Sequence, residues 1–458
     1  MKRDRTRGRV TRRGFIKNST ALGASAAVAP LVLKLTACSD SGDGSDDTQP
    51  VDATGADQPG AEPGGDNAGA AGDGADPGQP GDNDTGGDDN GAALAAGSVL
   101  IGLHAGDGEA AMAAAADSLD FSWLGDGDSV LIKVACNSGN PHPATTSPGG
   151  VRAMVAALKA RGAGRVIVAD QAGVEWVRLT ASGRHSSTRE RFEQNGLVAL
   201  ESDAELHFFD DGDWESGYFE ATLPEGSRWP RGMRVASIAG EVDHIIYMPR
   251  ISAHILAGVT NAQKSAIGWL RDDSRHDLHR DAVDFYEKYA EINYVEEIRS
   301  RFRMVVTVNE AVQLFGGPDE GTAFQMDPPL VLASSSLANH DAVATSILVT
   351  LQNTSGATSS GMAYNPGFAS IANGFFAGGT GVGGTSGPAG TWTSAAPNSS
   401  YQVHNFAESV DGERAVVRGW ELSGGKPSSI EVVLKGDEID ADLKNGIESH
   451  GGGLYSIG

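Results

Sequence analysis

Cysteine is scarce in this chain: of its 458 residues, only Cys38 and Cys136 are cysteines. Two cysteines allow at most one disulfide within the chain, and none if Cys38 is modified during export. Without cross-links, the folded part must be stabilised by its core. Roughly 360 residues follow the N-terminal hundred, which suffices for a large core in one large or two smaller domains.

Basic residues are missing from one long stretch. Residues 39–97 consist mainly of Asp, Gly, Ala, Pro and Asn, and they hold 14 acidic residues but no basic one. Such a segment buries too little apolar surface to offset its ordering entropy, so we expect a disordered, self-repelling linker. The formal net charge of the whole chain is −25, which argues against nucleic acid as a partner.

Long apolar runs are lacking near the N-terminus. The run from Ala21 to Leu33 is too short to span a bilayer, and it follows "TRRGFIK", which carries Arg12 and Arg13. This order is typical of a processed export signal, and the arginine pair resembles the twin-arginine pattern. The run leads into "LTAC", whose Cys38 resembles the lipidated first residue of a lipoprotein. An ordinary signal with an incidental cysteine is the alternative.

These features predict a twin-arginine lipoprotein signal at 1–38, a disordered linker at 39–97 and a folded α/β domain at 98–458. The resemblance implies a protein on the periplasmic side, attached to the membrane by lipid on Cys38. Ser39, and not aspartate, follows this cysteine, which favours the outer membrane. Twin-arginine export carries folded proteins, often with an inserted cofactor, so it hints at a cofactor.

Short apolar runs at 98–103, 128–136, 165–170, 243–251 and 429–436 predict buried strands. A further strand is expected within 303–317, and "PLVLASSS" predicts a strand that precedes a helix. Helical spacing after Pro148 predicts a helix between two of the strands, which makes a parallel unit. We therefore expect an α/β fold with a largely parallel sheet flanked by helices in Rossmann-like units. The Gly/Ser-rich region at about 354–400 is expected to form long loops.

Ligands of such sheets bind beyond the carboxyl ends of the strands. Asp170 ends the strand "RVIVAD", and "PRISAHILAGVTNAQKSAIG" follows the strand at 243–251. This second stretch is mostly apolar or small but carries His254 and Lys264, ten residues apart. The pattern indicates a buried site that these two ionisable groups serve. "GGTGVGGTSG" does not open a helix, which argues against a phosphate loop, and no segment has the ligand spacing of an EF-hand.

The strands, "MPRISAHILAGVTNAQKSAIGWL" and "SSLANHDAVA" occur in an order that resembles the family called domain of unknown function 362, over about residues 98–350. Gly258, Thr260, Lys264 and Asp341 fit its pattern. Two elements depart from it: Lys133 is followed by "VACN" where the family has Pro-Asn, and "SAH" replaces Lys-Thr-His. The family has no established activity, so this resemblance implies a fold and a site.

The stretch is also distantly similar to the nickel-pincer lactate racemases. That resemblance implies His254 as an acid/base group, Lys264 as the covalent attachment point of the cofactor, Gly258 as the glycine between them, and His276 or His279 as the metal ligand. The racemases have a second acid/base histidine after the strand that corresponds to "RVIVAD". This chain has Asp170 and Glu175 there, so a carboxylate would have to replace it.

These residue types suit such chemistry. A buried lysine has a lowered pKa and becomes nucleophilic, and a neutral imidazole binds metals or exchanges protons near pH 7. The plainer alternatives are a hydrogen-bonded core histidine at His254, a lysine that binds an anion by charge alone, and a solvated loop at 271–281. For Asp341, the alternative is that it simply caps the helix that follows it.

Two classes of function follow. One is an exported enzyme that uses a metal or cofactor, with His254, Lys264 and Asp170 as catalytic residues and Lys264, Gly258 and Thr260 around the cofactor, acting on a small organic acid. The other is a non-catalytic lipoprotein that binds a small anionic ligand through His254 and Lys264. The identity of any cofactor stays open.

Overall fold

The computed structural model describes residues 94–319, 321–357 and 404–458. By its contacts the chain divides at Asp89 and Asn90, and the fold described below is that of the second unit, Asn90–Gly458. The signal with Cys38, nearly all of the linker and most of the Gly/Ser-rich region predicted at 354–400 lie outside the described residues.

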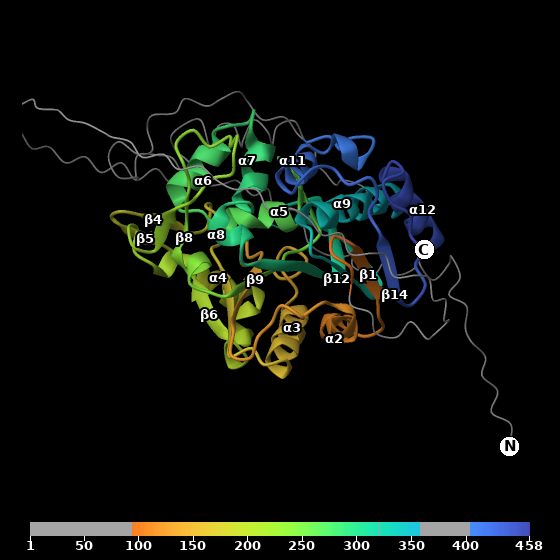
Figure 1. The fold of residues 1–458 in the computed structure, drawn as a ribbon, viewed down its shortest axis with the longest axis horizontal. Helices are drawn as coiled ribbons and strands as arrows, with labels where there is room; N and C mark the ends of the chain where they lie inside the picture. The colour runs from red at the N-terminus through yellow and green to blue at the C-terminus, as the bar shows by residue number, and fades with distance from the viewer. Residues whose placement is uncertain (1–93, 320, 358–403) are drawn as a thin grey trace, which may run out of the picture. The chain divides into compact units, whose positions relative to one another are not determined.

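The second unit is built on one large sheet (Figure 1). Its strands follow the order β14-β1-β13-β12-β9-β2-β3-β6, and a short hairpin of β10 and β11 joins it beside β12. The strands are β1 (Val99–Leu103), β2 (Ser129–Val134), β3 (Arg165–Asp170), β6 (Glu205–Phe208), β9 (His244–Met248), β10 (Ser252–His254), β11 (Gly258–Thr260), β12 (Phe302–Gly316), β13 (Gly321–Ser334) and β14 (Val432–Gly436). Along this order only β13 runs antiparallel to its neighbours. The predicted α/β class with a largely parallel sheet is confirmed.

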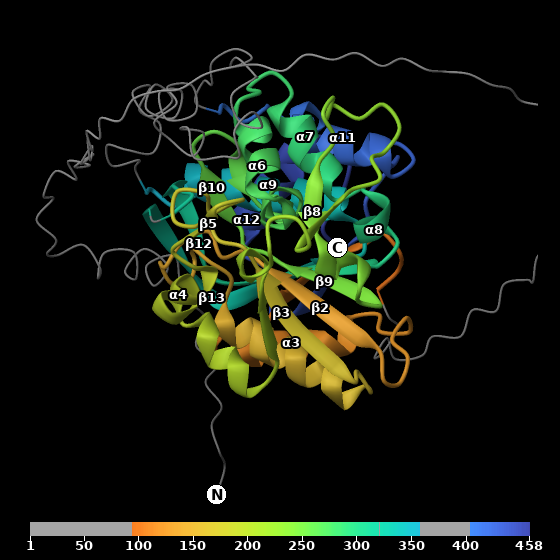
Figure 2. The same ribbon diagram turned by 90° about the vertical axis from the view of Figure 1, so that its left-hand side faces the viewer.

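Helices cover both faces of the sheet (Figures 1 and 2). Helices α2 (Gly108–Ala115) and α3 (Pro148–Ala160) lie on one face. The other face carries α5 (Ala262–Ser265), α6 (Asp272–His279), α7 (Phe285–Ile292), α9 (Leu337–Thr354), α11 (Arg414–Leu422) and α12 (Ala441–His450). The remaining elements are α4 (Thr188–Asn195), α8 (Glu296–Arg299) and the two small hairpins β4–β5 (Arg178–Thr180, Gly183–His185) and β7–β8 (Tyr218–Glu220, Arg234–Ala236).

The strands are apolar because both of their faces are covered. On β2, Val130, Ile132 and Val134 pack against α2 and α3, whereas Leu131 packs with the helices of the opposite face. This alternation buries side chains in two layers and removes the polar positions that a one-sided sheet would show. It explains why the sequence reads as short continuous apolar runs.

The unit β2–α3–β3 forms as the sequence predicts. Ser147 caps α3 by accepting a hydrogen bond from the amide of Gly150 at 3.2 Å, and Pro148 occupies the first helical turn. The long hairpin of β12 and β13 was not expected, because the sequence analysis treated the two strands separately. It places the antiparallel strand in the middle of the sheet.

The parallel strands end at one edge of the sheet, which we call the carboxyl edge. Residues that follow β2, β3, β9 and β12 gather there, and the hairpin β10–β11 and α5 follow β9. No helix within 94–319, 321–357 and 404–458 is long and apolar enough to cross a membrane.

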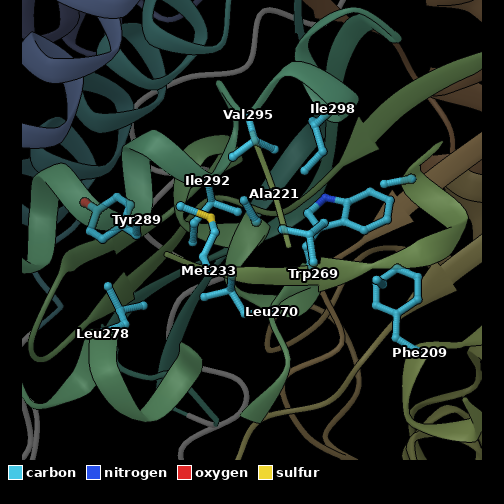
Figure 3. Packing of buried hydrophobic residues seen from close by; sticks show 14 of the residues in the cluster. Phe209, Ala221, Met233, Trp269, Leu270, Leu278, Tyr289, Ile292, Val295 and Ile298 are labelled. Carbon is cyan, nitrogen blue, oxygen red and sulfur yellow. The ribbon is translucent and has the colours of Figure 1, made fainter. Parts of the chain in front are cut away.

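The core between the sheet and α7 centres on Trp269, which has no exposed surface (Figure 3). Its ring stacks on Phe209 with the ring centroids 4.8 Å apart, and its indole nitrogen donates a hydrogen bond to the hydroxyl of Tyr247 at 2.9 Å. This tryptophan lies five residues after Lys264 and anchors the segment that carries the lysine.

Trp269→Ala is expected to lower the free energy of unfolding by about 3–5 kcal/mol, because it leaves a cavity and removes the donor to Tyr247. Urea unfolding followed by circular dichroism measures this loss. The control is Trp176→Ala, since Trp176 is 39% exposed and its loss should change stability by about 1 kcal/mol or less. Equal effects of both variants would contradict this account of the core.

Candidate functional site

His254 ends β10 at the tip of the short hairpin. It pairs with Gly258 across the hairpin, and Ser252 pairs with Thr260, so these side-chain positions share one face. The Nδ1 atom of His254 accepts the amides of Leu256 and Ala257 at 3.1 and 3.2 Å. The imidazole is therefore held with its proton on Nε2. Burial, together with the charge of Lys264, places the pKa of His254 well below its usual value.

Gly258 is required where it stands. Its φ of +76° lies in the left-handed region, and a side chain there would collide with the ring of His404. His404 returns to the hairpin from the C-terminal part of the chain: its amide donates to Ile255 O at 3.2 Å, and its Nδ1 lies 2.9 Å from the hydroxyl of Tyr286. The glycine of the predicted motif thus serves close packing of two segments.

Lys264 lies on α5, and Asp341 positions this short helix. The two carboxylate oxygens of Asp341 accept the amides of Ala262 and Gln263 at 2.8 and 3.0 Å. Asp341 therefore caps α5 and not its own helix, α9, whose cap is Ser336. This capping fixes the start of the turn that carries Lys264.

The ammonium group of Lys264 has no hydrogen-bond or ion-pair partner among the residues that the structure describes. The side chain is half-buried. Burial and the charge of Arg250 together lower the pKa of Lys264 to about 7, and the charge of Glu175 opposes this change. Asn261, three residues before Lys264, is fully buried, and neither polar atom of its side-chain amide has a partner in the described chain.

Arg250 follows β9 and is 1% exposed. It donates to Pro318 O at 2.7 Å and weakly to Ala135 O at 3.4 Å, while its buried Nε has no acceptor. No carboxylate of the described residues lies within 4 Å of the guanidinium. Burial lowers the pKa of Arg250 to about 10, which leaves it cationic at neutral pH.

Two carboxylates complete the cluster. Asp319, just after β12, accepts hydrogen bonds from Asn137 and, at 3.4 Å, from the indole of Trp176. Glu175 also bonds to Asn137. Glu175 is an exposed residue. Desolvation of its carboxylate and the negative charge of the neighbouring Asp319 nevertheless raise its pKa to about 7. These groups come from three different strand ends and meet at the carboxyl edge.

Asp170 is committed elsewhere. Its carboxylate lies 2.6 Å from the ammonium of Lys133 and accepts the amides of Cys136 and Gln171 at 2.6 and 2.8 Å. Burial raises the pKa of Asp170 and lowers that of Lys133, while their attraction opposes both changes. These contacts favour a positioning role for Asp170, and its predicted catalytic role stays a prediction.

The two histidines of α6 face different groups. Burial and then Arg280 and Arg231 lower the pKa of His276 to about 4. His279 feels the charge of Lys264, and burial lowers its pKa to about 3. The Nδ1 of His279 lies 2.7 Å from Arg275 O, so a ligand role would fall to Nε2.

Within the described residues, no group of three or more His, Cys, Asp or Glu side chains is placed to hold a metal ion. The metal roles of His276 and His279, and the cofactor roles of Lys264, Gly258 and Thr260, stay predictions.

A cavity of about 620 Å³ lies elsewhere, lined by Ser98, Phe302, Ser335, Trp420 and Glu431 among others. These residues stand where β1, β12 and β14 begin, at the edge opposite the carboxyl edge. None of the groups described above lines this cavity. The arrangement of charges, and not the cavity, therefore locates the candidate site.

The charges of Lys264 and His279 act on His254, whereas Asp170 contacts Lys133 and backbone amides; the predicted site roles of these residues stay predictions. Arg250, Asp319, Asn137 and Trp176 were missed. Arg250 lies within the stretch singled out from the sequence and follows a predicted strand, so its position could have identified it as a candidate site residue. Asp319 follows a hairpin strand, and nothing in its sequence pattern marks it.

Residues 130–346 match the family model described as domain of unknown function (DUF362). The resemblance predicted from the sequence is confirmed. The DUF362 region runs from β2 to α9 and contains Lys133, Arg250, His254, Lys264 and Asp341. No curated protein matches the chain.

Solved structures resemble the chain only distantly. A protein from Thermotoga maritima has 15% identity and a TM-score of 0.35, and the match covers 54% of this chain and 60% of that one. The chain thus spans three fifths of that protein. The lactate racemase apoprotein from Thermoanaerobacterium thermosaccharolyticum has 11% identity and a TM-score of 0.36, with 78% and 86% covered. The predicted distant similarity to lactate racemases is found, but it is too weak to transfer a site or a reaction.

Lys133→Met is expected to lower the free energy of unfolding by about 3–5 kcal/mol, because it leaves Asp170 buried without a counter-charge. The double variant Lys133→Met/Asp170→Asn should lose less than the sum of the two single variants, since neither charge is then left alone. Chemical denaturation measures these differences. Arg165→Met is the control: it breaks an exposed pair with Glu205 and should cost about 1 kcal/mol or less.

Proposed function

We propose that this protein binds a small organic acid at the carboxyl edge of its sheet, with Arg250 and Lys264 as the anion-binding groups and His254 beside them. The observation that carries the proposal is that both cations lack a carboxylate partner in the described chain. The raised pKa of Glu175 and the lowered pKa of Lys264 also mark the cluster as a functional-site candidate.

Unpaired buried cations are costly, because the protein interior solvates a charge poorly. Other buried cations of this chain are compensated: Lys133 pairs with Asp170, and Lys288 lies 2.6 Å from Asp281. Arg275 donates to four backbone carbonyls. Arg250 and Lys264 differ from them, which supports a ligand anion as the missing partner.

A carboxylate suits this pair of groups. The guanidinium of Arg250 offers a free, buried Nε–H beside its bonded nitrogens, and a planar carboxylate matches a guanidinium. Lys264 would add a second positive charge to the same ligand. Half-buried Lys264 and exposed Trp176 leave room for a molecule to enter from solvent.

Arg250→Met and Lys264→Met are each expected to weaken binding of lactate or pyruvate about 10–100-fold, the usual worth of one charged hydrogen bond. Isothermal titration calorimetry measures this on the full chain. Circular dichroism checks whether the Arg250 variant folds. If it does not, the Lys264 variant still tests the site, because Lys264 is only half-buried and its substitution should not unfold the protein. The control is Lys435→Met on β14, which should leave affinity unchanged.

The same titrations should depend on pH. Lys264 loses its positive charge, and Glu175 gains a negative charge, as pH rises through about 7. Both changes weaken the attraction for an anion, so affinity should fall across this pH. In the Lys264→Met variant, only the part of this pH dependence that is due to Glu175 should remain. Unchanged affinity across pH 6–8, or binding insensitive to both cation variants, would rule out this site.

We further propose that the protein is exported by the twin-arginine route and anchored by lipid on Cys38, with the acidic linker between membrane and domain. The order of the arginine pair, the apolar run and "LTAC" supports this. A site of this kind would then meet small acids outside the cytoplasm.

Cys38→Ser is expected to abolish incorporation of labelled fatty acid and to move the protein from the detergent phase to the aqueous phase. Cys136→Ser is the matched control, because the second cysteine is buried in the folded unit and should not affect labelling. Metabolic labelling in the native host checks both. Fatty acid retained on the Cys38 variant would refute the anchor.

A further inference from the structure

We infer that the bound acid is a 2-oxo acid and that Lys264 Nζ joins its carbonyl carbon as an imine, with Glu175 as the proton-transfer group. This inference rests on the proposed anion site and names its substrate class. It is carried by a half-buried amine on α5 that has no hydrogen-bond or ion-pair partner in the described chain, and by Asn137, which bonds both Glu175 and Asp319.

Lys264 has the surroundings that an amine nucleophile needs. A lysine is activated when it loses water and when another cation stands near it, because both disfavour the ammonium form. Lys264 is half-buried, and the positive charge of Arg250 acts on it. With a pKa of about 7, roughly half of it is neutral at pH 7, against about one part in 10³ to 10⁴ for an ordinary lysine. Lys133, although buried, is engaged by Asp170 and two carbonyls and has no such freedom.

Arg250 would orient the acid. If its guanidinium binds the carboxylate, the adjacent carbonyl carbon of a 2-oxo acid lies one bond away, toward the second group of the site. Lys264 is that second group. A 2-hydroxy acid of the same size would satisfy Arg250 equally but would offer the amine no carbonyl to attack.

Glu175 is placed to transfer protons. Asn137 bonds both Glu175 and Asp319, so the two carboxylates are held near each other, and the charge of Asp319 disfavours ionisation of Glu175. A carboxyl group that titrates near neutral pH both accepts and donates a proton readily. His254 is less suited, because its Nδ1 is occupied by two backbone amides.

The step balances without any further reagent. The lone pair of neutral Lys264 forms the C–N bond while the C=O π bond breaks and its oxygen is protonated. Glu175 takes one proton from the nitrogen and returns it to the hydroxyl, which leaves as water when the C=N bond forms. The carbonyl oxygen departs with one proton from the amine and one from solvent, and Lys264 ends as an iminium cation.

The test is reductive trapping on the full chain. The purified protein is incubated with pyruvate and cyanoborohydride at pH 7, and peptide mass mapping locates the adduct. Lys264 is expected to be modified at least about 100-fold faster than Lys159 or Lys435, because far more of its amine is neutral. Lys264→Met should give no adduct in this peptide. Glu175→Gln should slow trapping about tenfold or more at saturating pyruvate, where a change in affinity does not affect the rate, and Glu175→Asp should restore part of the rate.

The outcomes separate the two proposals. If lactate and pyruvate bind through Arg250 but Lys264 is trapped no faster than the control lysines, the imine is refuted and the anion site stands. If neither acid binds, the proposed function fails, and the imine with it. If the Lys264 peptide carries an added mass before any treatment, the lysine already holds another group and the inference is overturned.

Discussion

The buried ion pair of Lys133 and Asp170 is the interaction on which the candidate site depends. It joins the ends of β2 and β3, and Lys133 also donates to Ser265 O at 3.1 Å, which fastens the end of α5. Gly268 lies so close to the pair that any side chain there would collide with both charged groups. A single pair of charges therefore holds two strands and the Lys264 segment in one register. Because the pair is buried, losing either member would leave a charge that the core cannot solvate.

The same edge of the sheet contains charges that are satisfied and charges that are not. Asp341 caps α5 with both oxygens, and Asp170 has no oxygen without a partner. Arg250 and Lys264, by contrast, meet no carboxylate in the described chain, and Asn261 holds a buried amide without partners. Protein interiors rarely leave such groups unmatched, so the contrast itself points to a ligand. The hydrogen-bonded carboxylates of Asp170 and Asp341 thus hold the segments that carry the groups without a partner.

Sequence reasoning predicted the fold class correctly, but it could not show which side chains contact one another. Asp170 was singled out because it ends a strand. A strand end alone cannot reveal that Asp170 contacts Lys133 on the neighbouring strand β2. The alternative role considered for Asp341 was to cap its own helix, whereas Asp341 caps α5, which begins 79 positions earlier in the chain. His276 and His279 looked equivalent in sequence, yet only His279 feels the charge of Lys264.

By itself, the sequence determined most strands of the sheet, their burial and the place of His254 and Lys264 after a strand, because these follow from local periodicity and from chain order. It also carries the export pattern. Only the tertiary structure decided which charges are paired. Arg250, Glu175, Lys264 and Asp319 come from four separate segments, and whether each meets a partner depends on distances between strand ends that no local pattern encodes.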